Sequence, residues 1–196
     1  MLRKILLYGD PVLETDCDPV TDEEFGTPEL NKLVEDMFET MEDSQGVGLA
    51  APQVGESKRL FVIDVSGGED RTQRRVLINP EIVDTSGEQL GEEGCLSIPG
   101  FREKVRRPFR VTAKAKDVEG NEYELQGEEL LARAILHEND HINGVLFLQH
   151  LSALKRSLIQ RKIQKLRKKG EWELSDAAGR LHGDPCVRRS IVARAG

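Results

Sequence analysis

Residues 128–143, EELLARAILHENDHIN, carry the strongest structural signal in this chain of 196 residues. Their apolar side chains recur at helical spacing and Gly144 follows them, so the pattern predicts an amphipathic helix that ends near Asn143. His137 and His141 stand four residues apart, which places both imidazoles on the same face of this helix. The helix therefore carries two side chains that can reach one common ligand.

The five residues from His137 to His141 match the pattern H-E-x-x-H, in which two imidazoles hold one divalent cation. Glu138 lies about 100° round the helix from His137, so it reaches a metal-bound water without taking a ligand position. The cation lowers the pKa of that water to about 7, and a carboxylate can then take its proton. Two surface histidines on a charged helix are the alternative, but the chain has only 4 histidines and two of them fall at this spacing. We predict a metal-dependent hydrolase with Glu138 as its general base.

A catalytic metal site of this kind needs a third protein ligand, which the helix does not supply. Phe147 occupies the position of the third histidine in the metzincin pattern and excludes that pattern. The next glutamates downstream lie beyond a wholly basic helix and fit poorly. Cys95 is the best of the cysteines, because two aspartates flank Cys17 and disfavour its thiolate, and Cys186 lies in a segment of weak periodicity. A buried, inert cysteine is the alternative for Cys95.

The composition predicts a charge-rich globular protein, with 38% hydrophobic residues, 32% charged residues and a net charge of -7. The negative charge argues against sequence-specific nucleic-acid binding, which usually shows a basic footprint. Three widely spaced cysteines indicate a reducing compartment rather than a disulfide framework. No apolar run approaches the ~20 residues that span a bilayer, and the apolar N-terminal run is too short for a signal peptide. We expect a soluble, cytoplasmic protein with no membrane partner.

Two further helices and several strands are expected. One helix covers residues 27–43, with Thr27 as N-cap and Pro28 at its first position, and another covers about 152–169. The strand-like runs are 60–65, 76–80, 81–83, 108–116 and 122–125, of which the last two form a hairpin. Strands that lie between helices without regular alternation predict an α+β fold. We expect short antiparallel strands packed around the central metal-binding helix, a C-terminal helix, a catalytic domain over 1–170 and a loosely ordered tail over 171–196.

Three segments together resemble the motifs of the peptide deformylase family. They occur in the family's order and are Gly46-Val47-Gly48-Leu49-Ala50-Ala51-Pro52-Gln53, Glu93-Gly94-Cys95-Leu96-Ser97 and His137-Glu138-Asn139-Asp140-His141. The resemblance extends from about Arg3 to Lys169. Members of this family remove the formyl group from N-formyl-methionine at the N-terminus of newly made polypeptides. The resemblance therefore implies a deformylase, a hydrolase of protein biosynthesis, and N-formyl-methionyl nascent peptides as its partners.

The resemblance also implies a role for each site residue. Cys95, His137 and His141, together with a water, hold one divalent ion per chain. This ion is Fe²⁺ in the cell, and Zn²⁺ or another divalent ion can replace it in a preparation. A thiolate and imidazole set suits both metals. Glu138 is then the base and later the proton donor. Gln53 and the backbone N–H of Leu96 hold the developing oxyanion, where each donor contributes roughly 3 kcal/mol.

The resemblance places two further sets of residues around the substrate. Glycines that let a peptide backbone approach and pair as an added strand are Gly46, Gly48 and Gly94. Residues that line the methionine pocket are Val47, Leu130 and Ala134. Turn glycines and plain core packing are the alternatives. Arg133 lies on the same turn, and we expect its aliphatic stem to pack there with the charge outward.

The segment 155–169 holds eight basic residues and no acidic one. Such a run usually marks a solvated helix face; the resemblance implies contact with the ribosome instead. Two rival functions stay open. The first is a ribosome-binding or nucleic-acid-binding protein whose metal is only structural, and such a protein has no need of the base Glu138. The second is a different amide hydrolase that uses the same helix, and this function leaves Cys95 and the glycine loops unexplained.

Overall fold

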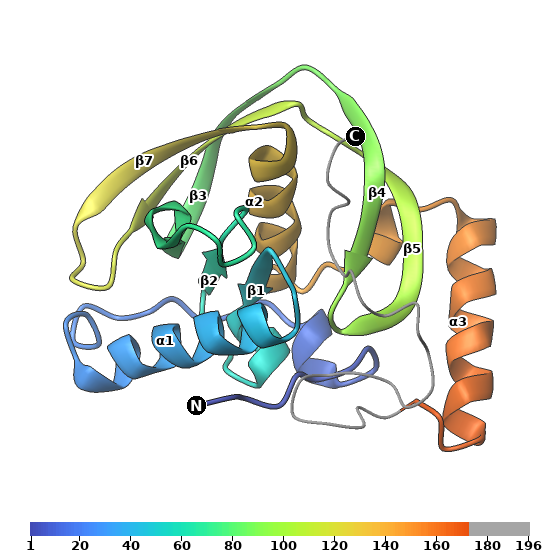
Figure 1. Ribbon diagram of the computed structural model, residues 1–196. Coiled ribbons are helices and arrows are strands. Elements are labelled where there is room, and N and C mark those ends of the chain that lie inside the picture. The colour runs from blue at the N-terminus through green and yellow to red at the C-terminus, as the bar shows by residue number, and fades with distance from the viewer. Residues whose placement is uncertain (173–196) are drawn as a thin grey trace.

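The computed structural model describes residues 1–172. It has the predicted mixed architecture of antiparallel strands and helices, with α2 between a five-stranded sheet and a two-stranded ribbon (Figure 1). The helices are α1 (Pro28–Asp43), α2 (Glu129–Ile142) and α3 (Ala153–Lys168). The strands are β1 (Gly48–Ala50), β2 (Leu60–Ile63), β3 (Arg75–Ser86), β4 (Gln89–Cys95), β5 (Ile98–Arg107), β6 (Arg110–Lys116) and β7 (Glu122–Glu128). Short 3-10 helices cover Pro11–Glu14, Ala51–Val54, Arg71–Gln73 and Phe147–His150.

All strand pairs are antiparallel, in the order β1-β2-β3-β6-β7 for the sheet and β4-β5 for the ribbon. The runs predicted as two strands, 76–80 and 81–83, form the single strand β3. The register shifts between Ile78 and Glu81 because Asn79 has a positive φ of 50°. The Asn79 side chain bonds both backbone groups of Val20, which satisfies the polar groups at this bend.

The three predicted helices are confirmed, and their ends follow local chemistry. Thr27 caps α1 by accepting a hydrogen bond from the backbone N–H of Leu30, and Pro28 occupies its first turn. Ser152 caps α3 in the same way by accepting from the backbone N–H of Lys155. Gly144 follows α2 with a φ of 65°, a left-handed conformation that glycine adopts without strain.

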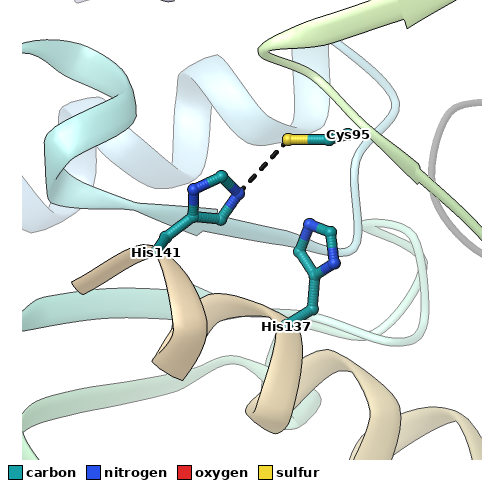
Figure 2. Close-up of side chains that lie close together, drawn as sticks. All are labelled: Cys95, His137 and His141. Atoms are coloured by element: carbon teal, nitrogen blue, oxygen red, sulfur yellow. Dashed lines mark hydrogen bonds between the residues drawn. The ribbon is translucent and has the colours of Figure 1, made fainter. Parts of the chain in front are cut away.

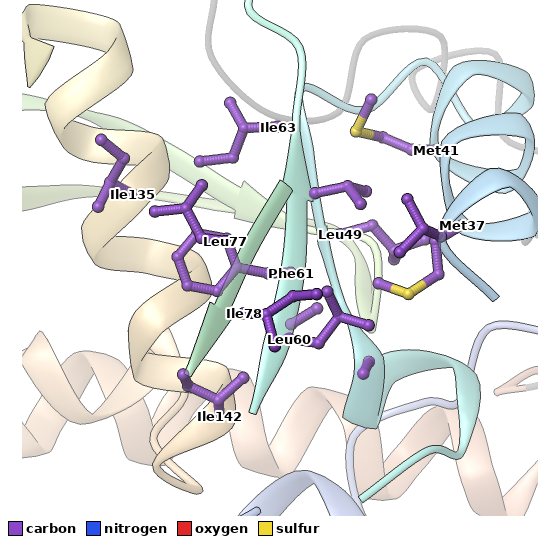
Figure 3. Packing of buried hydrophobic residues seen from close by; sticks show 14 of the residues in the cluster. Met37, Met41, Leu49, Leu60, Phe61, Ile63, Leu77, Ile78, Ile135 and Ile142 are labelled. Atoms are coloured by element: carbon purple, nitrogen blue, oxygen red, sulfur yellow. The ribbon is translucent and has the colours of Figure 1, made fainter. Parts of the chain in front are cut away.

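The main core lies between α1, the sheet and α2 (Figure 3). All four residues of β2 are fully buried, so this strand contacts apolar side chains on both of its faces. Ile135 and Ile142 of α2 lie on one side of the sheet, and Met37 and Met41 of α1 lie on the other. Burial on both faces fixes the position of α2 against the sheet.

A second core holds α3 against the ribbon and includes Cys95. Ile159 and Ile163 form the buried face of α3. Trp172 is 6% exposed and packs against Phe101 of β5, with ring centroids 6.1 Å apart. The predicted tail begins one residue before Trp172, and its remainder, 173–196, lies outside the described residues. Within residues 1–172 no helix is long and apolar enough to cross a membrane.

Candidate metal centre

The side chains of Cys95, His137 and His141 converge in the interior (Figure 2). Their possible ligand atoms all lie within 4.8 Å of one another. The Sγ of Cys95 lies 3.2 Å from Nε2 of His141, and the two imidazole rings are 5.1 Å apart in an edge-to-face arrangement. In the described part of the chain this is the one group of three or more His, Cys, Asp or Glu side chains that can share a cation.

The two histidines come from adjacent turns of α2, whereas the cysteine comes from the end of β4. The β4–β5 register shifts between Gly94 and Cys95, so Cys95 lies at the irregular tip of the ribbon and turns toward the helix. The other candidates do not join them. Cys17 is buried elsewhere, where burial raises the pKa of its thiol, and Glu171 is exposed beside Lys169. Cys186 lies outside the described residues.

Glu93 fixes the orientation of His137. Its Oε2 lies 3.1 Å from Nδ1 of His137, so Nδ1 carries the proton and Nε2 faces Cys95 and His141. Nε2 of His137 is buried and has no hydrogen-bond partner among the described residues. A buried nitrogen without a partner, beside a thiol and a second imidazole, fits a divalent cation of the Zn²⁺ or Fe²⁺ type.

The electrostatics of the group also favour a positive charge. Burial lowers the pKa of His137, but the neighbouring Cys95 and Glu93 outweigh it and hold this pKa well above its usual range. Burial and the charge of His137 lower the pKa of His141 well below its usual range, so this imidazole is neutral. Burial opposes ionisation of Glu93, but hydrogen bonds with His137 and Arg107 keep its pKa well below the usual range. The centre thus attracts a cation and offers it a neutral ligand.

Glu138 lies beside this centre and is 1% exposed. Both of its carboxylate oxygens lack a hydrogen-bond partner within the described structure. Burial raises its pKa to about 7, with a further upward contribution from Glu93 and an opposing one from His137. A Cβ added at Gly48 of β1 would lie only 2.4 Å from Oε1 of Glu138, so the carboxylate packs directly over the bare backbone of Gly48.

Gln53 also lies next to the cysteine and is 1% exposed. Its Oε1 accepts from the backbone N–H of Ala50 at 2.9 Å, which turns the amide nitrogen inward. Nε2 lies 3.5 Å from Sγ of Cys95 and 3.2 Å from Oγ of Ser97. The amide therefore has a defined orientation, with its donor next to the predicted metal ligand.

The predicted pocket residues occupy different environments. Val47 and Ala134 are buried in the main core, while Leu130 is half-buried and belongs to neither core cluster. Leu130 precedes His137 by two helical turns and so lies on the same face of α2. Leu96 is buried, and a Cβ at Gly46 would lie 3.1 Å from its Cδ1. A Cβ at Gly94 would lie 3.3 Å from Cγ of Arg102.

The outward orientation expected for Arg133 is wrong. Its side chain is 4% exposed, and NH1 bonds Oε1 of Glu93 at 2.6 Å and the carbonyl of Val105 at 3.1 Å. Arg107 bonds the same carboxylate with two nitrogens and reaches Asp140 with the third. A charged side chain can point into the interior when a buried group of opposite charge lies there. Sequence spacing did not reveal that Glu93 is this partner of Arg133.

Comparisons with known proteins all point to one family. A family model described as polypeptide deformylase matches residues 2–157. A peptide deformylase of Acidobacterium capsulatum is 54% identical over 172 residues, which cover 88% of this chain and 99% of that protein. A peptide deformylase of Clostridium botulinum is 54% identical over 147 residues, covering 75% and 95%. The crystal structure of a peptide deformylase from Legionella pneumophila superposes with a TM-score of 0.79 at 46% identity, covering 87% of this chain and 98% of that one.

Proposed function

Because this chain belongs to the peptide deformylase family of hydrolases, we propose that it releases formate from N-formyl-methionine of nascent polypeptides through a metal-dependent reaction with Glu138 as base. The catalytic domain is residues 1–170, acting in the cytoplasm, where translation supplies the formylated chains. A divalent ion, Fe²⁺ in the cell, would be held by Cys95, His137 and His141. When bound, such an ion polarises a carbonyl and acidifies a coordinated water.

One observation carries this proposal: the buried Glu138 carboxylate has no hydrogen-bond partner in residues 1–172, yet it lies beside three convergent ligand side chains. An unpartnered buried carboxylate is costly unless it has a task or a ligand. A pKa raised by burial to about 7 suits a group that exchanges protons near neutral pH. A purely structural metal site needs no such group.

The side chains divide the reaction between them. Glu138 accepts the proton of the attacking water at a carboxylate oxygen while a new C–O bond forms at the formyl carbon. Gln53 Nε2 and the backbone N–H of Leu96 donate to the oxygen that becomes negative, which lowers the barrier. Glu138 then gives the proton to the amine nitrogen as the C–N bond breaks, which yields formate and a free methionine N-terminus.

The methionine side chain is expected beside Val47, Leu130 and Ala134. The half-buried Leu130 supports this position, because an apolar side chain outside both cores gains from contact with an apolar ligand. Gly46, Gly48 and Gly94 leave the substrate backbone room to pair along β1, whose outer edge has no neighbouring strand in the described sheet.

The test is formate release from formyl-Met-Ala by protein prepared anaerobically with Fe²⁺. Wild type should release formate, and Glu138→Gln, which keeps the shape of the side chain, should lower kcat by about 10²–10⁴-fold. Equal rates for the two proteins would refute the role of Glu138. No release by a metal-loaded wild type would refute the substrate assignment.

The basic face of α3 is proposed as a contact for the ribosome. Its buried face is formed by Ile159 and Ile163, which leaves most of its lysines and arginines exposed. Phosphate contacts weaken steeply with salt. Co-sedimentation with ribosomes should therefore occur at low salt and fall as salt is raised, and the absence of binding at low salt would end this proposal.

A further inference from the structure

Arg133 is a buried cation that the proposed reaction does not use. It lies one turn before His137 on α2, so both side chains leave the same face of the helix. Its NH1 donates to Oε1 of Glu93 at 2.6 Å, while Oε2 of the same carboxylate receives Nδ1 of His137 at 3.1 Å. Each oxygen of Glu93 therefore has a separate partner on α2.

This division of the carboxylate has a geometric consequence. Two fixed contacts, one at each oxygen, prevent the carboxylate from rotating about its last bond. With Oε2 fixed, the imidazole plane of His137 is fixed as well, and Nε2 keeps pointing at Cys95 and His141. Arg107 of β5 also bonds both oxygens, but it reaches α2 only through Asp140, whereas Arg133 is itself a residue of the helix that carries His137.

We propose that Arg133 is a positioning residue for the metal ligand His137, which it orients through Glu93. The inference rests on the metal site of the proposed function. It goes further because it assigns part of the cation affinity to Arg133, a residue that touches neither the metal nor the substrate. Hydrogen-bonded partners behind metal ligands typically contribute 10–100-fold to affinity.

Gly91 of β4 supplies the space for this guanidinium. A Cβ at Gly91 would lie 2.8 Å from NH2 of Arg133 and 3.1 Å from its Cζ. The φ of Gly91 is not in the left-handed region, so alanine is compatible with its backbone. Gly91→Ala therefore displaces the guanidinium without removing any charge from the interior.

The two arginines at Glu93 differ in how many nitrogens they use. Arg133 reaches both Glu93 and the Val105 carbonyl with NH1 alone, and its NH2 has no partner in the described residues. A lysine ammonium offers three donors from one point and can make the same two contacts. Arg107 uses Nε and NH2 on Glu93 and NH1 on Asp140, a fork that lysine cannot reproduce.

The experiment measures Co²⁺ binding to the full chain, by competition with a chelator and by the visible absorption of the Co²⁺ protein. Arg133→Met should weaken Co²⁺ binding by about tenfold and shift the absorption bands, because His137 loses its fixed orientation. Arg133→Lys should keep both the Co²⁺ affinity and the absorption bands near those of wild type. Arg107→Lys should not keep them there. Gly91→Ala should change affinity and bands in the same direction as Arg133→Met.

The outcomes separate the inference from the proposed function. Wild type without Co²⁺ affinity would refute the metal site itself. Wild-type affinity and an unchanged spectrum in Arg133→Met, with or without a lower melting temperature, would refute the positioning role and leave the metal site intact. If Arg133→Met does not fold, Gly91→Ala decides: an unchanged spectrum there overturns the inference.

Discussion

Gly48→Ala tests whether the missing side chain at Gly48 of β1 is required to position the carboxylate of Glu138. The added Cβ would lie 2.4 Å from Oε1 of Glu138, and an ordinary contact begins at 3.4 Å. The carboxylate must therefore retreat by about 1 Å, a misplacement that costs up to about 100-fold in rate. That loss corresponds to about 2.7 kcal/mol in the activation free energy.

The same substitution should leave the fold intact. The φ of Gly48 is not positive, and the contacted atoms belong to the end of a side chain rather than to backbone. Alanine gains about 0.4–1 kcal/mol by restricting the unfolded chain, but displacing the buried carboxylate costs about 1–3 kcal/mol through overpacking. We expect kcat/KM for formyl-Met-Ala to fall about 100-fold while the melting temperature falls by only a few degrees.

Glu138→Asp distinguishes a clash with the carboxylate from a clash with substrate. The shorter side chain withdraws the carboxylate by one methylene, so Gly48→Ala should cost far less in the Glu138→Asp protein than in wild type. Full additivity of the two losses would place the effect of the Cβ on the substrate instead. A Gly48→Ala protein with unimpaired kcat/KM would refute the reasoning altogether.

Three further changes have defined outcomes. Removal of the metal by a chelator should lower the melting temperature by about 5–10 °C, since a ligand at 100 times its Kd contributes about 2.7 kcal/mol, and Cys95→Ser protein should lose this sensitivity. Trp172→Ala should destabilise the fold by about 3 kcal/mol in thermal unfolding, because the indole is buried against Phe101, whereas Leu154→Ala on the exposed side of α3 should change little. Burial raises the pKa of Tyr123 from 10.0 to about 12, so its stabilising contribution is complete below pH 10 and is lost as pH rises toward 12. The absorbance titration of wild type minus Tyr123→Phe should show this late phenolate, and a difference centred near pH 10 would contradict it.

The sequence predicted those parts of the fold that depend on local spacing. The helices followed from apolar periodicity and, for α1, from the Thr27 cap. The β4–β5 ribbon was missed, because its residues do not alternate between apolar and polar. Glu92 is exposed and Glu93 is 1% exposed, although the two side chains are identical in type. Only the tertiary structure tells such neighbours apart.

The site divides along the same line. His137, Glu138 and His141 were predictable because one helix turn relates them, whereas Cys95 required the resemblance to a family. The outward prediction for Arg133 assumed that a lone charge on an apolar helix face leaves for solvent. It failed because Glu93, 40 residues away in the chain, is buried against the same face. The negative charges of Glu93 and the partly buried Asp140 balance the positive charges of Arg107 and Arg133. An electrically balanced network of this kind can surround a metal ligand without opposing the charge of the cation, which is why an inward arginine is compatible with a cation nearby.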